Sequence, residues 1–428
     1  MHTDADVELS ESAEGVPNAA WTWFTDERAI VDTDAGDGAP RLLVGGVTAE
    51  AGDGGGDVVV LWYDVGSGAT GHAVLHAGFE QDDHDGPALF VRPDGRYLAM
   101  YAKHGTDSFT RWRVSSAPHD PTEWDEERRL DNGGGTTYCN VYRLPGEAGG
   151  DGRTYCFTRA VNWDPNVLVS TDAGTTWSRS GRLFTLGDES TRPYLKYWGD
   201  GERIHCVTTE GHPHDENNGI YHAYLRDGTL YGSGGGVLNE DVSEETSDLP
   251  RVPDLTTVLA PDTVVDGERL TNAWTIDVAV DADAHPVALF QARVDGDPED
   301  HRFLYARHDG DSWSVHPLAE AGGHLYDREY DYTGLGSIDP DATDRVVVST
   351  SIDPRDGERL DRYQLFAGET DDGGTSWDWR ALTPDASRDN LRPIVPAWPG
   401  DRTALVWMRG QYAEWTEWET RAVARLDY

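Results

Sequence analysis

The chain has 428 residues, of which 78 are acidic and 35 are Lys or Arg, so its formal net charge at pH 7 is −43. Carboxylates spread over the whole chain, with lysine only at Lys103 and Lys196, indicate a solvated halophilic surface and argue against nucleic acid as a ligand. No long apolar run is present, which excludes a membrane-spanning helix, and three cysteines without a CxxC motif imply no disulfide framework.

The N-terminal residues 1–19 are acidic and polar, so we expect a disordered leader rather than a secretion signal. As written, the chain would be cytoplasmic, or secreted if a signal had been removed from it, and the location therefore stays unknown. From Trp21 onward, short apolar runs separated by Gly and Asp turns predict one all-β domain over residues 20–428.

Two segments share the pattern S/T-x-D-x-G-x-T-W, the Asp-box: Ser170–Trp177 and Thr370–Trp377. In this motif the Asp and Gly shape a hairpin turn and the Trp packs between sheets, so its role is structural. Degenerate relatives occur at His308–Trp313 and Pro118–Trp124. Turn-then-Trp units that recur every few tens of residues predict a repeat fold of short strands, a single β-propeller.

At about four strands a blade, the chain accommodates seven blades. We predict sheets over residues 20–70, 80–125, 136–182, 190–235, 270–316, 324–380 and 390–428. The intervening segment 236–268 is rich in Glu, Asp, Ser and Thr and is predicted to be a long excursion between blades. We expect N-terminal strand residues to pair with the last blade.

The stretch 192–228 concentrates Arg, His, Tyr and Cys side chains in two short hairpins, more proton-transfer chemistry than a surface loop needs. Alternation in Tyr194–Trp198 and Ile204–Thr208 predicts two strands joined by a Gly-Asp-Gly turn. A second pair begins at Ile220–Leu225. Each of these side chains, taken alone, has a structural alternative, so the stretch is a candidate wall of an active site.

A metal site is a further hypothesis for this stretch. Cys206 could join His205, His214 or His222, but His205 and Cys206 are adjacent in a strand and point to opposite faces, so at most one of the two joins a given site. A thiolate and imidazoles suit zinc when four ligands converge. The predicted metal residues are Cys206 and His222.

Several stretches together resemble the BNR-4 repeat family, and within it the propeller-type ulvan lyases, which cut uronate-containing algal sulfated polysaccharides. The stretches that carry the resemblance are Trp21–Arg28, His84–Leu89, Tyr101–His104, Thr137–Tyr138, Phe157–Arg159, Arg192–Tyr194, Thr209–Pro213, Ile220–His222, Tyr330–Thr333, Leu391–Ile394 and Trp407–Gly410. They span nearly the whole chain.

The resemblance implies β-elimination at a uronate, in which a positive group neutralises the carboxylate, a base removes the C5 proton and an acid protonates the departing O4. Matched by position, the implied acid–base residues are His84, His104, Tyr138 and Tyr194, and the implied carboxylate-neutralising residues are Arg159 and His212. Arg192, Tyr221 and Arg409 are predicted to bind substrate. Which residue is base and which is acid is left open.

The residues themselves support part of this assignment. His84 and His104 flank the predicted hairpin Ala88–Ala102, so both could reach one face of a propeller. Arg159 ends the predicted strand Thr154–Arg159, where its guanidinium could hold a carboxylate in a two-pronged hydrogen bond. The alternative for each residue is a structural hydrogen bond.

The resemblance also bears on ligands. No cofactor is required for the elimination, although family members can carry a structural metal ion, and zinc or calcium is left open. The expected partner is an anionic uronate polysaccharide, with neither nucleic acid nor a membrane, and we expect a monomer.

Two other functions stay open at this point. A sialidase-type glycoside hydrolase would need an arginine cluster, which Arg159, Arg192, Arg392 and Arg409 could supply, but no Arg-Ile-Pro lies near the first blade. A non-catalytic glycan-binding propeller would stack sugars on some of the 16 Trp, most of which are expected to be blade plugs.

Overall fold

The structure is a computed structural model that describes residues 5–10, 18–35, 39–49, 56–187, 192–244, 248–326, 329–400 and 402–428. The chain divides into two compact units. Unit 1 comprises residues 1–161, 166–179 and 394–428, and unit 2 comprises residues 162–165 and 180–393. No helix among the described residues is long and apolar enough to cross a membrane.

Three sheets of the N-terminal part follow one another in chain order. The first contains β2 (Ala29–Asp32), β3 (Arg41–Val47), β4 (Val58–Asp64) and β5 (Thr70–His76). The second contains β6 (Ala88–Val91), β7 (Tyr97–Ala102), β8 (Phe109–Ala117), β9 (Asp120–Trp124) and β10 (Arg128–Asp131). The third contains β11 (Thr137–Leu144), β12 (Arg153–Arg159), β13 (Pro165–Ser170) and β14 (Ser178–Arg182).

The next three sheets begin at β15. The fourth contains β15 (Leu195–Gly199), β16 (Ile204–Thr208), β17 (Ile220–Arg226), β18 (Thr229–Gly232), β19 (Val237–Asn239) and β20 (Thr256–Leu259). The fifth contains β21 (Val264–Val265), β22 (Glu268–Val280), β23 (Pro286–Val294), β24 (Asp297–His308) and β25 (Trp313–Gly322). The sixth contains β26 (Gly336–Ile338), β27 (Arg345–Ile352), β28 (Arg359–Glu369) and β29 (Asp378–Ala381).

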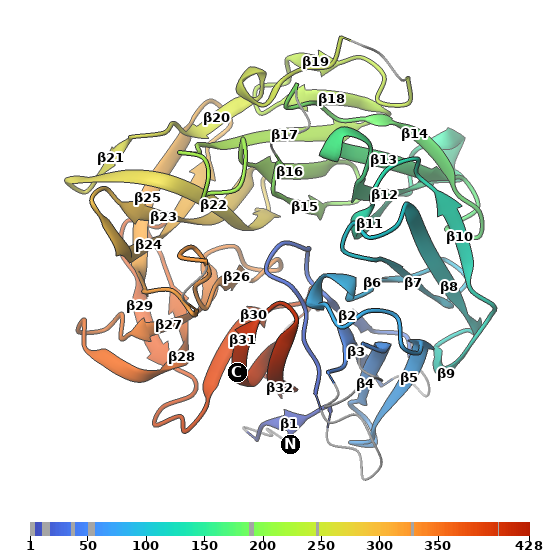
Figure 1. Cartoon of the computed structure of the whole chain (residues 1–428), viewed down its shortest axis with the longest axis horizontal. Helices are drawn as coiled ribbons and strands as arrows, with labels where there is room; N and C mark the ends of the chain where they lie inside the picture. The colour runs from blue at the N-terminus through green and yellow to red at the C-terminus, as the bar shows by residue number, and fades with distance from the viewer. Residues whose placement is uncertain are drawn as a thin grey trace. The chain divides into compact units, whose positions relative to one another are not determined.

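The seventh sheet joins the two ends of the chain. It contains β30 (Asp389–Ile394), β31 (Ala404–Glu414), β32 (Glu417–Leu426) and β1 (Val7–Glu8), which pairs with β32 (Figure 1). Four short 3-10 turns complete the described elements: η1 (Asp83–Asp85), η2 (Ala148–Gly150), η3 (Val161–Trp163) and η4 (Val252–Asp254). The seven sheets are the blades of a seven-bladed β-propeller, which confirms the predicted fold class.

Burial explains why these segments are strands. β4 is an apolar run whose first four residues are all buried, as expected for a strand covered on both faces. The outer strand β10 is mostly exposed and carries charged residues. In unit 1, side chains from neighbouring sheets pack into apolar cores, among them one around Leu43, Val60 and Tyr97 and another around Leu98, Met100 and Cys156.

Two predictions about chain segments need correction. Val7–Glu8 lies within the predicted disordered leader, yet it forms β1, because its main chain pairs with Ala424 and Val423 of the last blade. This pairing is the one expected between the N-terminus and the last blade; residues 1–4 and 11–17 lie outside the described residues. The predicted excursion 236–268 contributes β19, β20 and β21, because its apolar residues extend neighbouring sheets, and residues 245–247 are not described.

The turns of the two Asp-boxes, Ser170–Trp177 and Thr370–Trp377, make the same hydrogen bond. The Asp172 carboxylate accepts the main-chain N–H of Thr176 at 2.8 Å, and Asp372 accepts that of Ser376 at 2.9 Å. Trp177 ends the first motif and is buried in the core that contains Leu98 and Cys156. The hairpins predicted around Gly199–Gly201 and at Ile220–Leu225 are also present, as β15–β16 and β17–β18.

Candidate active site

The turn η1 presents His84 immediately before β6. Asp82 caps the turn, because its carboxylate accepts the main-chain N–H of His84 at 3.0 Å, and Asp85 N–H donates to the Asp82 carbonyl at 3.2 Å. All three residues of the turn, Asp83, His84 and Asp85, are buried. The acidic sequence around His84 therefore folds into a tight turn that surrounds one imidazole with carboxylates.

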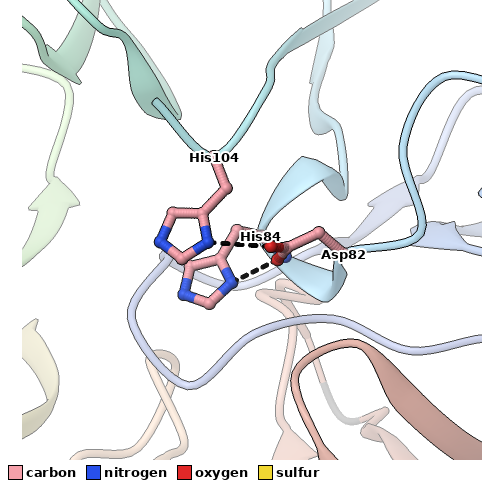
Figure 2. A group of neighbouring side chains, drawn as sticks. All are labelled: Asp82, His84 and His104. Atoms are coloured by element: carbon pink, nitrogen blue, oxygen red, sulfur yellow. Dashed lines mark hydrogen bonds and ion pairs between the residues drawn. The ribbon is translucent and has the colours of Figure 1, made fainter. Parts of the chain in front are cut away.

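His104, which follows β7, stacks on His84. The two ring centroids lie 3.7 Å apart and the planes differ by 10°. One carboxylate orients both rings, because Asp82 Oδ1 lies 2.6 Å from Nδ1 of His84 and Asp82 Oδ2 lies 2.8 Å from Nδ1 of His104. Figure 2 shows both second ring nitrogens turned away from Asp82. The His84 side chain is 3% exposed and that of His104 is 27% exposed, so His104 is the more accessible ring.

The surroundings shift the pKa values of the two stacked rings in opposite directions. Burial alone would lower the pKa of His84, but the charges of Asp82 and Asp83 outweigh it and raise this pKa to about 9. Burial and the neighbouring His84 charge lower the pKa of His104 to about 4, although Asp82 opposes them. Near neutral pH the pair therefore consists of one imidazolium and one neutral imidazole.

Two further carboxyl groups of the turn complete the environment of His84. Asp83 Oδ1 lies 2.9 Å from His84 Nδ1, and Asp83 Oδ2 accepts the hydroxyl of Tyr412 at 2.6 Å. Burial raises the pKa of Asp83 above its ordinary value, against the effect of the His84 charge. Burial and the charge of Asp82 raise the pKa of Asp85 well above its ordinary value.

A tyrosine and an arginine flank the stacked pair. Tyr138 lies where β11 carries a bulge, and its backbone is in the left-handed region with φ of 64°. Such a conformation costs a non-glycine residue on the order of 1–3 kcal/mol and aims the side chain out of the regular strand direction. The Tyr138 ring lies 5.6 Å from that of His84, and the guanidinium of Arg159, at the end of β12, lies 4.7 Å from the Tyr138 ring.

The structure thus brings four of the predicted site residues together in unit 1: His84, His104, Tyr138 and Arg159. The buried Arg159 charge also acts on His104, whose pKa it helps to lower. The cluster combines a proton donor, a proton acceptor and a fixed positive charge. Such a combination can transfer protons at a carbon atom next to a bound carboxylate.

Two other predicted residues, Tyr194 and His212, form a second cluster in unit 2. The Tyr194 ring contacts the rings of His212 and Trp274 edge-on, with each pair of centroids 5.3 Å apart. The Trp274 ring also lies 4.8 Å from that of His212 and 5.5 Å from that of Tyr332. His212 Nε2 lies 3.7 Å from the carboxylate of Glu329. The cluster is a group of mostly buried aromatic rings with one imidazole and one carboxylate.

Each of the three predicted substrate-binding residues contacts a different partner. Arg192 stacks on the ring of Trp163 at 5.2 Å. The hydroxyl of Tyr221 donates to Glu210, and the guanidinium of Arg409 pairs with Asp6. Their assignment to substrate binding stays a prediction.

The predicted pairing of Cys206 and His222 in a metal site is wrong. Cys206 is opposite Ala223 in the β16–β17 ladder, whereas His222 is opposite Val207, and successive residues of a strand point to opposite faces. The two side chains therefore lie on different faces of the sheet. His222 lies instead against His205, with Nε2 of His222 3.1 Å from Nδ1 of His205, beside a cavity of about 330 Å³.

Among the described residues, Asp82, His84 and His104 bring atoms of the kind that bind a metal ion within 4.8 Å of one another. Their distances do not fit one, because two ligands about 2.1 Å from a tetrahedral ion are roughly 3.4 Å apart. The two Nδ1–carboxylate distances of 2.6 and 2.8 Å are hydrogen-bond lengths, and the rings are parallel rather than convergent. We interpret the group as a hydrogen-bonded acid–base pair.

Asp82, Asp83, Asp85 and Tyr412 are the residues of this site that sequence reasoning missed. The signal available was a single histidine flanked by three carboxylates in Asp82–Asp85. In a chain with 78 acidic residues this run did not stand out. Tyr412 has no local signal, because it reaches Asp83 across 329 positions of the sequence.

Comparisons with known proteins agree with the fold. Two solved structures of a polysaccharide lyase, PL25-Ulvanlyase, match with TM-scores of 0.63 and 0.64 at 14% and 13% identity, covering 98% of this chain and 95% of theirs. The second is bound to -[GlcA(1-4)Rha3S]-. The polysaccharide lyase Uly1 matches with a TM-score of 0.56 at 12% identity, over 99% of this chain and 97% of its own.

A search of curated proteins found no match. The model of a BNR repeat-containing family, BNR-4, matches residues 51–321, which is more than half of the chain. The resemblance predicted from the turn motifs and site residues is therefore confirmed, and the chain belongs to the BNR-4 repeat family.

Proposed function

We propose that this protein is a polysaccharide lyase that cleaves a uronate-containing polymer by β-elimination. The observation that carries the proposal is the stacked pair of His84 and His104, both held by Asp82, beside the buried charge of Arg159. The raised pKa of His84 and the lowered pKa of His104 fit the roles of acid and base. The fold shared with solved polysaccharide lyases supports it.

β-Elimination at a uronate needs three groups. A base removes the proton from C5, the electron pair forms the C4–C5 double bond, and the C4–O4 bond breaks as an acid protonates O4. We assign the base to the neutral, more accessible His104 and the acid to the His84 imidazolium. Their second ring nitrogens are turned away from Asp82, so Asp82 does not occupy the atoms that would exchange protons with a substrate (Figure 2).

The pair conserves its charge during this reaction. His104 gains the C5 proton while His84 gives its own proton to O4, so the two rings carry one positive charge before and after. As His84 loses its charge, the repulsion that lowers the pKa of His104 disappears, and His104 becomes a stronger base. Stacking at 3.7 Å therefore couples the two transfers. Asp82 holds both rings by Nδ1 throughout.

Arg159 is assigned to the substrate carboxylate. Abstraction of the C5 proton places negative charge on the carboxylate, and a fixed guanidinium in a water-poor site stabilises that charge. Tyr138 lies between Arg159 and His84, so it is the third side chain within reach of the transferred protons. We further propose that the polymer is of the ulvan type, because a solved lyase of the same fold is bound to -[GlcA(1-4)Rha3S]-.

The proposal is tested by incubating the protein in molar potassium chloride with a panel of uronate polysaccharides, including ulvan. Elimination creates a conjugated, unsaturated uronate that absorbs in the near ultraviolet. We expect absorbance to rise with at least one uronate polymer and to be abolished in His84→Gln. Release of reducing sugar without absorbance would indicate a glycoside hydrolase, and binding without any reaction would indicate a glycan-binding propeller; either result contradicts the proposal.

A further inference from the structure

The hairpin β31–β32 at the C-terminal end holds the turn that carries His84. Asp83 N–H donates to the main-chain carbonyl of Trp415 at 3.0 Å, and the Gln81 side chain donates to the carbonyl of Thr416 at 2.9 Å. The third contact is the Tyr412 hydroxyl, 2.6 Å from Asp83 Oδ2. Two of the three contacts end on Asp83, the residue directly before His84.

Tyr412 is fixed in this position from both ends of its side chain. Its ring packs against that of Trp23 at 4.5 Å, and it is 6% exposed. Asp83 is fully buried and has few routes to water, so the Tyr412 hydroxyl supplies a hydrogen bond that solvent does not replace. The other carboxylate oxygen of Asp83 remains 2.9 Å from Nδ1 of His84.

We propose that Tyr412 is a positioning residue of the acid–base pair: its hydroxyl holds the buried Asp83 carboxylate against the imidazole of His84. Where it concerns catalysis, this inference rests on the proposed lyase function. The effect on His84 itself does not, since it follows from the geometry of Tyr412, Asp83 and His84 alone. The last blade thereby sets the protonation of a residue about 330 positions earlier in the chain.

The direction of the effect follows from the charges. The groups that face His84 and Asp83 are Asp82, Asp85, His104, Tyr138 and Tyr412. Without the hydroxyl of Tyr412, the ionised form of Asp83 is less stable and its pKa rises further. The less Asp83 is ionised, the more weakly it attracts the His84 imidazolium, so the pKa of His84 falls from about 9.

The test is an NMR titration of labelled histidine in wild type and in Tyr412→Phe. The chain has 15 histidines, so the His84 signal is assigned as the one lost in His84→Gln. We expect the pKa of His84 to fall by about one unit, as for the loss of one hydrogen bond to a neighbouring charge. An unchanged His84 pKa in a folded Tyr412→Phe protein would overturn the inference.

Tyr97→Phe is the matched control. Tyr97 is buried like Tyr412, and its hydroxyl donates to the Asp32 carboxylate at 2.6 Å, which in turn lies 2.7 Å from Nδ1 of His119. The control removes the same hydroxyl from the same kind of Tyr–Asp–His arrangement. It should leave the His84 titration unchanged, and a shift as large as that of Tyr412→Phe would overturn the inference as well.

A second variant covers the case in which Tyr412→Phe does not fold. Asp83→Asn keeps an acceptor for Tyr412 but removes the charge, and it should lower the pKa of His84 at least as far. With a lyase assay available, the alkaline limit of activity should move down in both variants while KM stays close to wild type. If wild type shows no lyase activity, the proposed function fails; if the His84 pKa does not move, this inference fails independently.

Discussion

Replacing Asp82 by Asn removes the charge that organises the stacked pair while keeping its shape. Asn retains a side-chain oxygen that can still cap η1 by accepting the His84 N–H, so the turn should form. It no longer attracts the imidazolium of His84, and its amide cannot accept from both rings. The variant therefore tests the electrostatic role of Asp82 apart from its role in folding.

The size of the effect follows from the pKa of His84. Its rise from an ordinary 6.5 to about 9 corresponds to about 3.4 kcal/mol of net stabilisation of the imidazolium, which is what remains of the attraction of Asp82 and Asp83 after the opposing cost of burial. If the pKa returns to about 6.5, the protonated fraction at pH 8 falls from about 90% to about 3%, a loss of about 30-fold in the acid form. At pH 6 both proteins are mostly protonated, so the loss should nearly vanish.

The assay is the initial rate of near-ultraviolet absorbance on a uronate polymer from pH 5.5 to pH 9.5. Asp82→Asn should show a rate deficit that grows with pH, because the alkaline limit of activity moves from about 9 to about 6.5 or lower. A deficit of equal size at every pH, in a protein with wild-type circular dichroism, would refute the reasoning. It would mean that Asp82 orients the rings without setting the charge of His84.

Three further predictions concern the role of Arg159 in catalysis, the loss of stability at acidic pH, and the dependence of stability on salt. Arg159→Ala should lower the elimination rate by about 10²–10³-fold, because it removes a group that stabilises the developing anion. Arg92→Ala removes another buried arginine and should keep the wild-type rate, and equal losses in the two variants would contradict the assignment. The pKa of His104 is lowered to about 4, so between pH 6.5 and pH 4 the unfolded state binds a proton that the folded state does not. Wild type should therefore lose up to about 3.4 kcal/mol of unfolding free energy over this range, measured by denaturant titration, and His104→Gln should not show this loss. With a net charge of −43, the unfolding midpoint should rise with potassium chloride into the molar range, and a flat or falling midpoint would count against a halophilic surface.

Much of the fold could be predicted because its signals are local. Turn residues and alternating apolar runs mark each blade, and the predicted sheets 136–182 and 190–235 begin within a few residues of β11 and β15. The prediction that failed depended on contacts between distant parts of the chain. Val7–Glu8 is only two residues long and lies in an acidic segment, and only pairing with the far end of the chain makes it a strand.

The candidate site divides in the same way. His84, His104, Tyr138 and Arg159 were predicted from the family resemblance, and the structure brings them together. The residues that set their charges were not predicted. Asp82 bridges two rings that are 20 positions apart in the chain, and a contact of this kind depends on three-dimensional packing rather than on spacing. The Cys206 and His222 pairing failed because strand register, which places them on opposite faces, is not evident from residue types.

The central claim, β-elimination by this protein, is tested most directly by the mass of the oligosaccharide ends formed when the protein cleaves a uronate polymer in ¹⁸O-labelled water. Elimination adds no water, so the account predicts new non-reducing ends that are one water lighter than hydrolysis products, with no label incorporated at either new end at the moment of cleavage. Saturated ends with label at the new reducing end would show hydrolysis and would contradict the account.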